Sequence, residues 1–431
     1  MKQVEIYDGN MLHTEPIKVD YENPKYAFIG TDSKGERCYV PFNDDILSRH
    51  MVFLGGIGTG KTNAFFQILR QIRRNLTEND IVVIFDTKGD FFKEFYRQGD
   101  IVISNDETAI GENGKDYWNI FNELDINEHL EENIVEISKT LFSSRIEKTN
   151  QPFFPNAAKD LFSAILTGFL RNNDRTCLNN KALRDFLDRS TSADIREMLN
   201  RNDDLRAMTS YISDDRSPQT QGVISELQQL IREIFLGNFK KEGTLSMRNI
   251  VRNKGGKFVF IEYDIGVGNM LSPIYSLLYD MAIKEALCRS KSEGNVFFVT
   301  DEFSLIPNLK HVDDAVNFGR SLGIKFMIGI QNVNQIFDMY GEERGRSLLS
   351  GFLTSVAFRV NDEGSRAFIK GLHGTNRKKE VFMASVQGRG ISEQIRDANV
   401  VEDWDILRLK IGQAIIGFPS QEPFVFRFEK A

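Results

Sequence analysis

Short apolar runs alternate with amphipathic stretches along most of the chain. The runs are strand-sized and lie at residues 51–54, 81–85, 258–261, 296–299 and 326–328. Continuous apolar runs of this length are typical of strands buried on both faces of a parallel sheet. Between them, stretches such as residues 63–75 carry apolar side chains at helical spacing. This alternation predicts an α/β fold with a mainly parallel central sheet.

The pattern changes in the middle of the chain, where strand-like runs stop and amphipathic helices follow one another. In residues 223–235, for example, the apolar side chains fall on one helical face. We therefore expect three parts: a small β-rich lead-in at residues 1–45, an α/β domain made of residues 46–124 and 239–431, and an all-helical domain inserted at residues 125–238.

A glycine-rich turn separates the first apolar run from the helical stretch that follows it. It reads Gly55-Gly56-Ile57-Gly58-Thr59-Gly60-Lys61-Thr62 and fits the P-loop pattern GxxxxGK[ST]. Glycines let backbone N–H groups wrap phosphates closely, and the N-terminus of the next helix adds positive potential. Lys61 suits the outer phosphates of ATP, and the Thr62 hydroxyl suits Mg²⁺. We assign this segment, together with Asn63, to nucleotide binding.

An acidic pair follows the apolar run at residues 296–299. Asp301 and Glu302 come directly after Thr300, where a P-loop enzyme needs a carboxylate for Mg²⁺ and a group that orients the attacking water. We expect Asp301 to hold Mg²⁺ through water and Glu302 to act as the catalytic base. Loops often begin with carboxylates, so the pair gains its meaning from the P-loop upstream. The glutamate favours hydrolysis over a kinase-like transfer.

Two further residues are candidates for the catalytic site. Arg320 belongs to a predicted helix at residues 311–322, where it falls at the edge of the buried face and could complete the ATP site of a neighbouring subunit. A solvated helix arginine is the alternative. Gln331 follows the run that ends at Ile330 and could sense the γ-phosphate or the attacking water; a plain polar residue at a strand end is the alternative.

Composition and charge narrow the function classes. The chain has 431 residues and a formal net charge of −7, which disfavours a simple basic nucleic-acid binder but allows a locally basic channel. No apolar stretch approaches the ~20 residues that span a bilayer. The cysteines Cys38, Cys177 and Cys288 lack metal-site spacing. We expect a cytoplasmic protein whose membrane association, if any, is peripheral and comes through a partner.

An ordered series of motifs resembles one family. The series starts with Arg49-His50 and the P-loop and continues with Asp86-Thr87-Lys88-Gly89-Asp90, Tyr117-Trp118-Asn119-Ile120-Phe121, Asp301-Glu302-Phe303, Phe318-Gly319-Arg320-Ser321-Leu322-Gly323 and Gly329-Ile330-Gln331-Asn332. Together these residues resemble the type IV coupling proteins, the TraG/TraD-type conjugative DNA-transfer ATPases of the FtsK–HerA superfamily. The resemblance implies a RecA-like motor domain with an all-helical domain inserted between its two nucleotide-binding motifs.

The resemblance also implies an activity and partners. Members form ring hexamers that pump DNA, or hand it with a relaxase to a secretion channel, and the family's arginine finger and glutamine sensor match Arg320 and Gln331. Members usually carry N-terminal transmembrane helices, which this sequence lacks, so docking on a separate membrane subunit is expected if it serves a channel. Candidate DNA contacts are the clusters Arg248/Arg252/Lys254/Lys257 and Arg377-Lys378-Lys379, for which solvated surface is the alternative.

Three functions remain open at this point. The first is an ATP-hydrolysing DNA translocase in conjugative transfer. The second is a translocase similar to HerA that acts in repair or phage defence. The third is an ATP-driven adaptor that brings protein cargo to a secretion channel.

Overall fold

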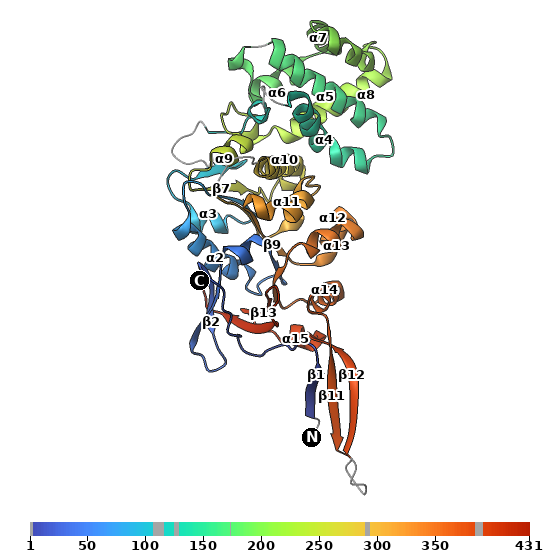
Figure 1. The fold of residues 1–431 in the computed structure, drawn as a ribbon. Coiled ribbons are helices and arrows are strands. Elements are labelled where there is room, and N and C mark those ends of the chain that lie inside the picture. The colour runs from blue at the N-terminus through green and yellow to red at the C-terminus, as the bar shows by residue number, and fades with distance from the viewer. Residues whose placement is uncertain (1–2, 107–115, 125–128, 173, 289–293, 384–390) are drawn as a thin grey trace. The chain divides into compact units, whose positions relative to one another are not determined.

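The structure is a computed structural model and describes residues 3–106, 116–124, 129–172, 174–288, 294–383 and 391–431 (Figure 1). The chain divides into two compact units. The first comprises Met1–Thr77, Phe297–Ser304 and Val316–Ala431, and the second comprises Glu78–Val296 and Leu305–Ala315. Each unit therefore combines segments that are far apart in the sequence.

The first unit is organised around strands in the order β3-β2-β14-β13-β10-β4-β9-β8. In chain order these are β2 (Tyr26–Thr31), β3 (Arg37–Phe42), β4 (Met51–Leu54), β8 (Val296–Thr300), β9 (Ile324–Ile330), β10 (Thr354–Phe358), β13 (Gln413–Gly417) and β14 (Phe424–Phe428). The strands β10, β4 and β9 are parallel, and every residue of β4 and β9 is buried. The strands from β13 to β3 continue the sheet in antiparallel pairs.

Helices and a second sheet complete this unit. Its helices are α1 (Asp44–Ser48), α2 (Lys61–Asn75), α12 (Val333–Tyr340), α13 (Glu342–Ser350), α14 (Glu363–His373) and α15 (Asp403–Leu407). A separate antiparallel sheet has the order β1-β11-β12, formed by β1 (Gln3–Asp8), β11 (Thr375–Met383) and β12 (Ile391–Asn399). Aromatic rings fill the core beneath the antiparallel strands, where Phe28 lies 4.9 Å from Phe42 and 5.3 Å from Phe428 between ring centroids.

The second unit combines three parallel strands with many helices. The strand β7 (Lys257–Glu262) pairs in parallel with β5 (Ile81–Asp86) and β6 (Ile101–Ile103). The helices are α3 (Asp90–Phe95), α4 (Leu130–Lys148), α5 (Phe153–Asn172), α6 (Asn180–Arg189), α7 (Ser192–Asn200), α8 (Pro218–Ile234), α9 (Met247–Asn253) and α10 (Gly268–Leu287). The helix α11 (Val312–Phe318) has residues in both units.

The helical character expected for the middle of the chain is confirmed. Between residues 129 and 238, the described part holds the helices α4 to α8 and short 3-10 turns, and no strand. The start of the expected insertion, at residues 125–128, lies outside the described residues. None of the helices in the described ranges combines the length and the apolar character that crossing a bilayer requires.

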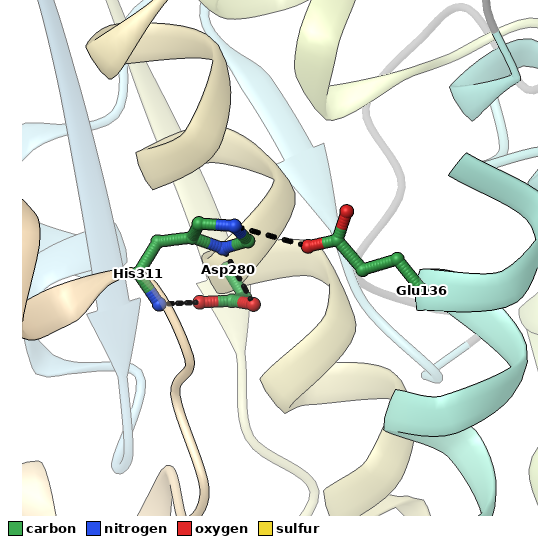
Figure 2. Close-up of side chains that lie close together, drawn as sticks. All are labelled: Glu136, Asp280 and His311. Atoms are coloured by element: carbon green, nitrogen blue, oxygen red, sulfur yellow. Dashed lines mark hydrogen bonds and ion pairs between the residues drawn. The ribbon is translucent and has the colours of Figure 1, made fainter. Parts of the chain in front are cut away.

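A buried ionic cluster ties α4 to α10 within the second unit (Figure 2). The His311 ring lies between two carboxylates: Nδ1 is 3.0 Å from Asp280 Oδ2, and Nε2 is 3.1 Å from Glu136 Oε1. Lys284 also pairs with Glu136, and the backbone N–H of Lys310 donates to Asp280 at 3.0 Å. Because the Lys284 ammonium and the His311 imidazole already pair with these carboxylates, the cluster is an ion-pair network rather than a typical binding site for a metal cation.

Candidate nucleotide-binding site

The P-loop segment, residues 55–62, runs from the end of β4 into the first turn of α2, which is the strand–turn–helix context that the sequence predicts. Two of its glycines have a positive φ, 72° at Gly58 and 119° at Gly60, which side chains with a Cβ rarely adopt. At Gly55 the reason is space, because a Cβ there would lie 2.7 Å from both Phe358 Cβ and Thr59 Oγ1. The loop therefore needs glycine for conformation at two positions and for close packing at a third.

Neighbouring segments hold the P-loop backbone in place. The N–H of Gly55 donates to the carbonyl of Ile330 at 3.1 Å, and the N–H of Gly56 donates to that of Arg359 at 3.0 Å. The carbonyl of Thr59 accepts from the N–H of Gly412 at 2.9 Å. The loop is thus built on the ends of β9 and β10 and on the turn before β13.

The N-terminus of α2 carries the side chains expected to meet phosphate. The helix begins at Lys61, and its first turn contains no acidic residue, so its positive end is not neutralised locally. The Lys61 ammonium donates to the carbonyl of Gly55 and to that of Gly56, the latter at 3.3 Å. Thr62 follows on the same turn. Asn63 instead bonds to the C-terminal segment, where its Nδ2 donates to the carbonyl of Glu429 at 2.9 Å.

The acidic pair lies at the end of β8, inside the same unit as the P-loop. Asp301 is buried, with 8% of its surface exposed. The neighbouring strand β9 approaches it very closely, since a Cβ on Gly329 would lie 2.3 Å from the Asp301 carbonyl oxygen. Glycine at position 329 therefore allows β9 to pack directly against the acidic pair.

The Glu302 carboxylate is held by two hydrogen bonds, one at each oxygen. The Ser304 hydroxyl donates to Oε1 at 2.6 Å, and the Gln331 amide donates to Oε2. Burial raises the pKa of Glu302 above its ordinary value, while these two hydrogen bonds and the positive charge of Lys61 oppose the rise. A partly buried carboxylate that is held in one orientation and has a raised pKa has the properties of a general base.

Arg320 differs in its local structure from the sequence-based expectation. The helix α11 ends at Phe318, and Arg320 lies in the 3-10 turn Gly319–Leu322, so the helical-wheel argument for its position was wrong. Gly323, with a φ of 74°, ends the turn. Arg320 is about half exposed and donates to Asp45 Oδ1 at 2.5 Å. Among the described residues, no hydrogen bond or ion pair joins it to the P-loop, Glu302 or Gln331.

Several residues of the site escaped the sequence analysis. Ser304 is two positions from Glu302, and a hydroxyl so close to a candidate base is a local signal that could have been used. Phe358, Arg359 and Gly412 carry no recognisable pattern. Their contacts with the P-loop arise only because β10 and the turn before β13 fold beside β4.

The first basic cluster considered for DNA contact is partly internal. Arg248 is buried, and Arg248 and Arg252 both pair with Glu285, at 3.2 and 2.8 Å. Lys254 is also buried, with 7% of its surface exposed. The two ion pairs with Glu285 link α9 to α10. Arg252 and Lys257 are exposed, so burial withdraws only Arg248 and Lys254 from a phosphate backbone. In the second cluster, Arg377 is exposed and pairs with Asp397.

Solved structures share this fold. A plasmid coupling protein TrwB in complex with ADP and Mg²⁺ superposes with a TM-score of 0.74 at 17% identity, covering 100% of this chain and 95% of that one. The VirB4 structure of Thermoanaerobacter pseudethanolicus gives a TM-score of 0.59 at 14% identity, covering 96% of this chain and 99% of that one. The fold is that of a RecA-like P-loop NTPase with an inserted all-helical region, as predicted.

The sequence places the chain more narrowly. The family model described as "Type IV secretion-system coupling protein DNA-binding domain" matches residues 36–425. The chain belongs to this family, which confirms the resemblance. Coupling protein TraD of Escherichia coli (strain K12) is 22% identical over 376 residues, covering 85% of this chain and 49% of TraD. VirD4 of Bartonella henselae, a type IV secretion system-coupling protein, is 22% identical over 374 residues, covering 79% of this chain and 56% of VirD4. The chain thus spans about half the length of these curated relatives.

Proposed function

We propose that this protein is an ATP-hydrolysing motor that moves DNA in conjugative transfer through a type IV secretion system. One observation carries the proposal. Glu302 is partly buried, accepts a hydrogen bond from Gln331, and lies within the electrostatic influence of Lys61. A phosphate-binding lysine, a candidate base and a candidate sensor therefore share one edge of a sheet, which is the arrangement that hydrolysis of a nucleotide requires.

Each residue has a proposed role at this site. The backbone of residues 55–60 and the N-terminus of α2 would bind the phosphates of ATP, and Lys61 would leave its two carbonyl partners to contact the outer phosphates. Thr62 and Asp301 supply the oxygen donors that Mg²⁺ prefers. Glu302 would orient and deprotonate the attacking water. Gln331 would contact the γ-phosphate, so that its loss on hydrolysis changes the position of Gln331 at the end of β9. Mg²⁺, when bound, neutralises charge on the phosphates.

Arg320 is proposed to act on a neighbouring copy of this chain. In the described part of the chain its ion pair is with Asp45, and neither a hydrogen bond nor an ion pair joins it to the P-loop, which supports a role in trans. Exposed apolar side chains occur both near Arg320 and near the P-loop. Phe318, near Arg320, is 66% exposed. Ile57 in the P-loop is 83% exposed, and Ile411, next to the P-loop contact Gly412, is 81% exposed. Two different surfaces that meet head to tail generate a ring when the rotation closes, and we propose a hexamer.

DNA is the proposed substrate because of the family. The matching family model is described as a DNA-binding domain, and TraD and VirD4 are described as coupling proteins. A relaxase, a secretion channel and a membrane subunit are the corresponding partners. DNA contacts would be mainly to phosphates, and their strength would fall steeply with salt.

ATP turnover with and without DNA tests the motor. The full chain should hydrolyse ATP with Mg²⁺, and single- or double-stranded DNA should raise turnover severalfold at about 150 mM salt. The Lys61→Ala variant is the matched control, since it should lose turnover with and without DNA. If neither form of DNA raises turnover and no DNA binding survives at that salt, the motor proposal fails and an adaptor for protein cargo becomes the better explanation.

A further inference from the structure

The carboxylate of Asp45 holds two guanidinium groups at the start of α1. One of its oxygens, Oδ1, accepts from Arg320 Nη2 at 2.5 Å. The other, Oδ2, lies 3.0 Å from both Nε and Nη2 of Arg49, one helical turn away. Because the two arginines use different oxygens, Asp45 can hold both of them at once. Asp45 is itself partly exposed, so water and an incoming ligand can reach the pair.

The segment that carries Arg320 is fixed at both ends by one imidazole. His50 Nε2 lies 3.1 Å from the carbonyl oxygen of Val316, and the backbone N–H of Phe326 donates to His50 Nδ1 at 3.1 Å. His50 is buried, and burial lowers its pKa to about 4, so the ring is neutral at working pH. A neutral ring can donate at Nε2 and accept at Nδ1, as these contacts require. Residues 316–326 thus form a short loop with a fixed base.

The interior of this loop is also tightly packed. A Cβ on Gly319 would lie 2.8 Å from Ile324 Cβ, so glycine lets the 3-10 turn close onto the start of β9. The buried Lys325 ammonium pairs with Asp44 Oδ1 at 2.9 Å. The backbone under Arg320 is therefore rigid, and the remaining freedom is in its long side chain. Asp45 is the group that restricts this side chain.

We propose that Asp45 is a positioning residue for Arg320, holding one edge of its guanidinium so that the other N–H groups are left for a phosphate bound to a neighbouring copy of this chain. The inference rests on the proposed role of Arg320 in trans. Prepositioning saves the rotamer entropy that a long exposed arginine would otherwise lose at the moment of contact. Arg49 balances the negative charge of Asp45, which limits repulsion of the phosphate.

A double-mutant cycle tests the coupling directly. In the otherwise unchanged chain, Asp45→Asn should lower kcat about two- to fivefold with little change in KM, the range expected for an exposed ion pair. In the Arg320→Ala background the same change should have no effect, because no guanidinium remains to be held. Asp45→Glu should restore part of the loss. An equal loss in both backgrounds, or a gain in kcat, would overturn the proposal.

Asp44→Asn is the matched control for damage to α1. It removes the neighbouring carboxylate, whose partner Lys325 is buried with 2% of its side chain exposed. We expect it to lower the melting temperature more than Asp45→Asn does. If Asp45→Asn lowers the melting temperature as much as Asp44→Asn, the effect of Asp45 is structural.

Mixed rings separate this inference from the function on which it rests. Arg320→Ala subunits, which keep an intact P-loop, should recover turnover when mixed with Lys61→Ala subunits, which keep an intact Arg320. Adding Asp45→Asn to the Lys61→Ala subunit should reduce this recovery, whereas adding it to the Arg320→Ala subunit should not, although that subunit performs the hydrolysis. If the starting mixture shows no recovery, the role of Arg320 in trans fails, and the double-mutant cycle still decides whether Asp45 positions it.

Discussion

The side-chain amide of Gln331 donates a hydrogen bond to the Glu302 carboxylate. Gln331 directly follows β9 and Glu302 lies shortly after β8, so the contact links the ends of two strands that are neighbours in the sheet. It gives Gln331 a defined effect on the candidate base, because a hydrogen bond to the charged form of a carboxylate favours that form. Any movement of Gln331 toward a phosphate would therefore also change the proton affinity of Glu302.

Glu302→Gln should keep nucleotide binding and stall turnover. The glutamine amide is nearly isosteric and can still accept from Gln331 through its oxygen, so the local structure should be preserved. It cannot take a proton from water, and kcat should fall by about a hundredfold or more. Steady-state ATPase rates and nucleotide affinity measure the two effects. Glu343→Gln, at an exposed position on α13, is the control that should change neither. Substantial activity in Glu302→Gln would remove it as the base.

Gln331→Ala should change the pH dependence of turnover. Burial already raises the pKa of Glu302, and the Gln331 hydrogen bond opposes this rise. A general base works only when deprotonated, so kcat should decline as the pH falls through that raised pKa. Without Gln331 the pKa rises further, and the acidic limb of the profile should move to higher pH. If kcat falls but the acidic limb of the pH profile stays at the same pH, Gln331 acts on the phosphate alone. Gln331→Glu, which adds a like charge, should displace the limb more.

Lys61→Ala should abolish hydrolysis and weaken nucleotide binding without destabilising the free protein. The partners of Lys61 in this structure include two P-loop carbonyls, which are backbone groups that water can satisfy at a partly exposed loop. A thermal shift experiment separates the effects: ADP with Mg²⁺ should raise the melting temperature of the original chain but much less that of the variant. Lys34→Ala, in an exposed turn of the same unit, should respond to nucleotide as the original chain does. An unchanged response of Lys61→Ala to nucleotide would contradict the assignment.

The sequence predicts the parts of the site that directly follow buried strands. The P-loop, Asp301-Glu302 and Gln331 each follow a buried strand, and parallel strands bring their carboxyl ends to one edge of a sheet. The sequence does not predict the pairing of Arg320 with Asp45, which are 275 positions apart and meet only through the register of β4 with β9. The helical wheel also failed at Arg320, because Gly319 and Gly323 favour a tight turn there.

The His311 cluster gives a prediction for stability against pH. Burial alone would lower the pKa of His311, but its hydrogen bond to Asp280 and the charges of Asp280 and Glu136 raise it above 6.5, and Lys284 opposes this only in part. A group whose pKa is raised by folding stabilises the folded state fully below its unfolded value, about 6.5. That stabilisation is lost as the pH rises through the folded value.

His311→Gln should therefore lower the melting temperature more at pH 6 than at pH 9. At pH 6 the variant leaves the Asp280 and Glu136 carboxylates without their shared cation, whereas at pH 9 the imidazole of the original chain carries less charge and less is lost. A difference of a few degrees is expected for a protein of this size. His129→Gln, at an exposed position before α4, is the matched control and should show no such dependence. A destabilisation by His311→Gln that is equal at both pH values would mean that the ring is not charged in the folded state and that it ties α4 to α10 as a neutral hydrogen-bond donor.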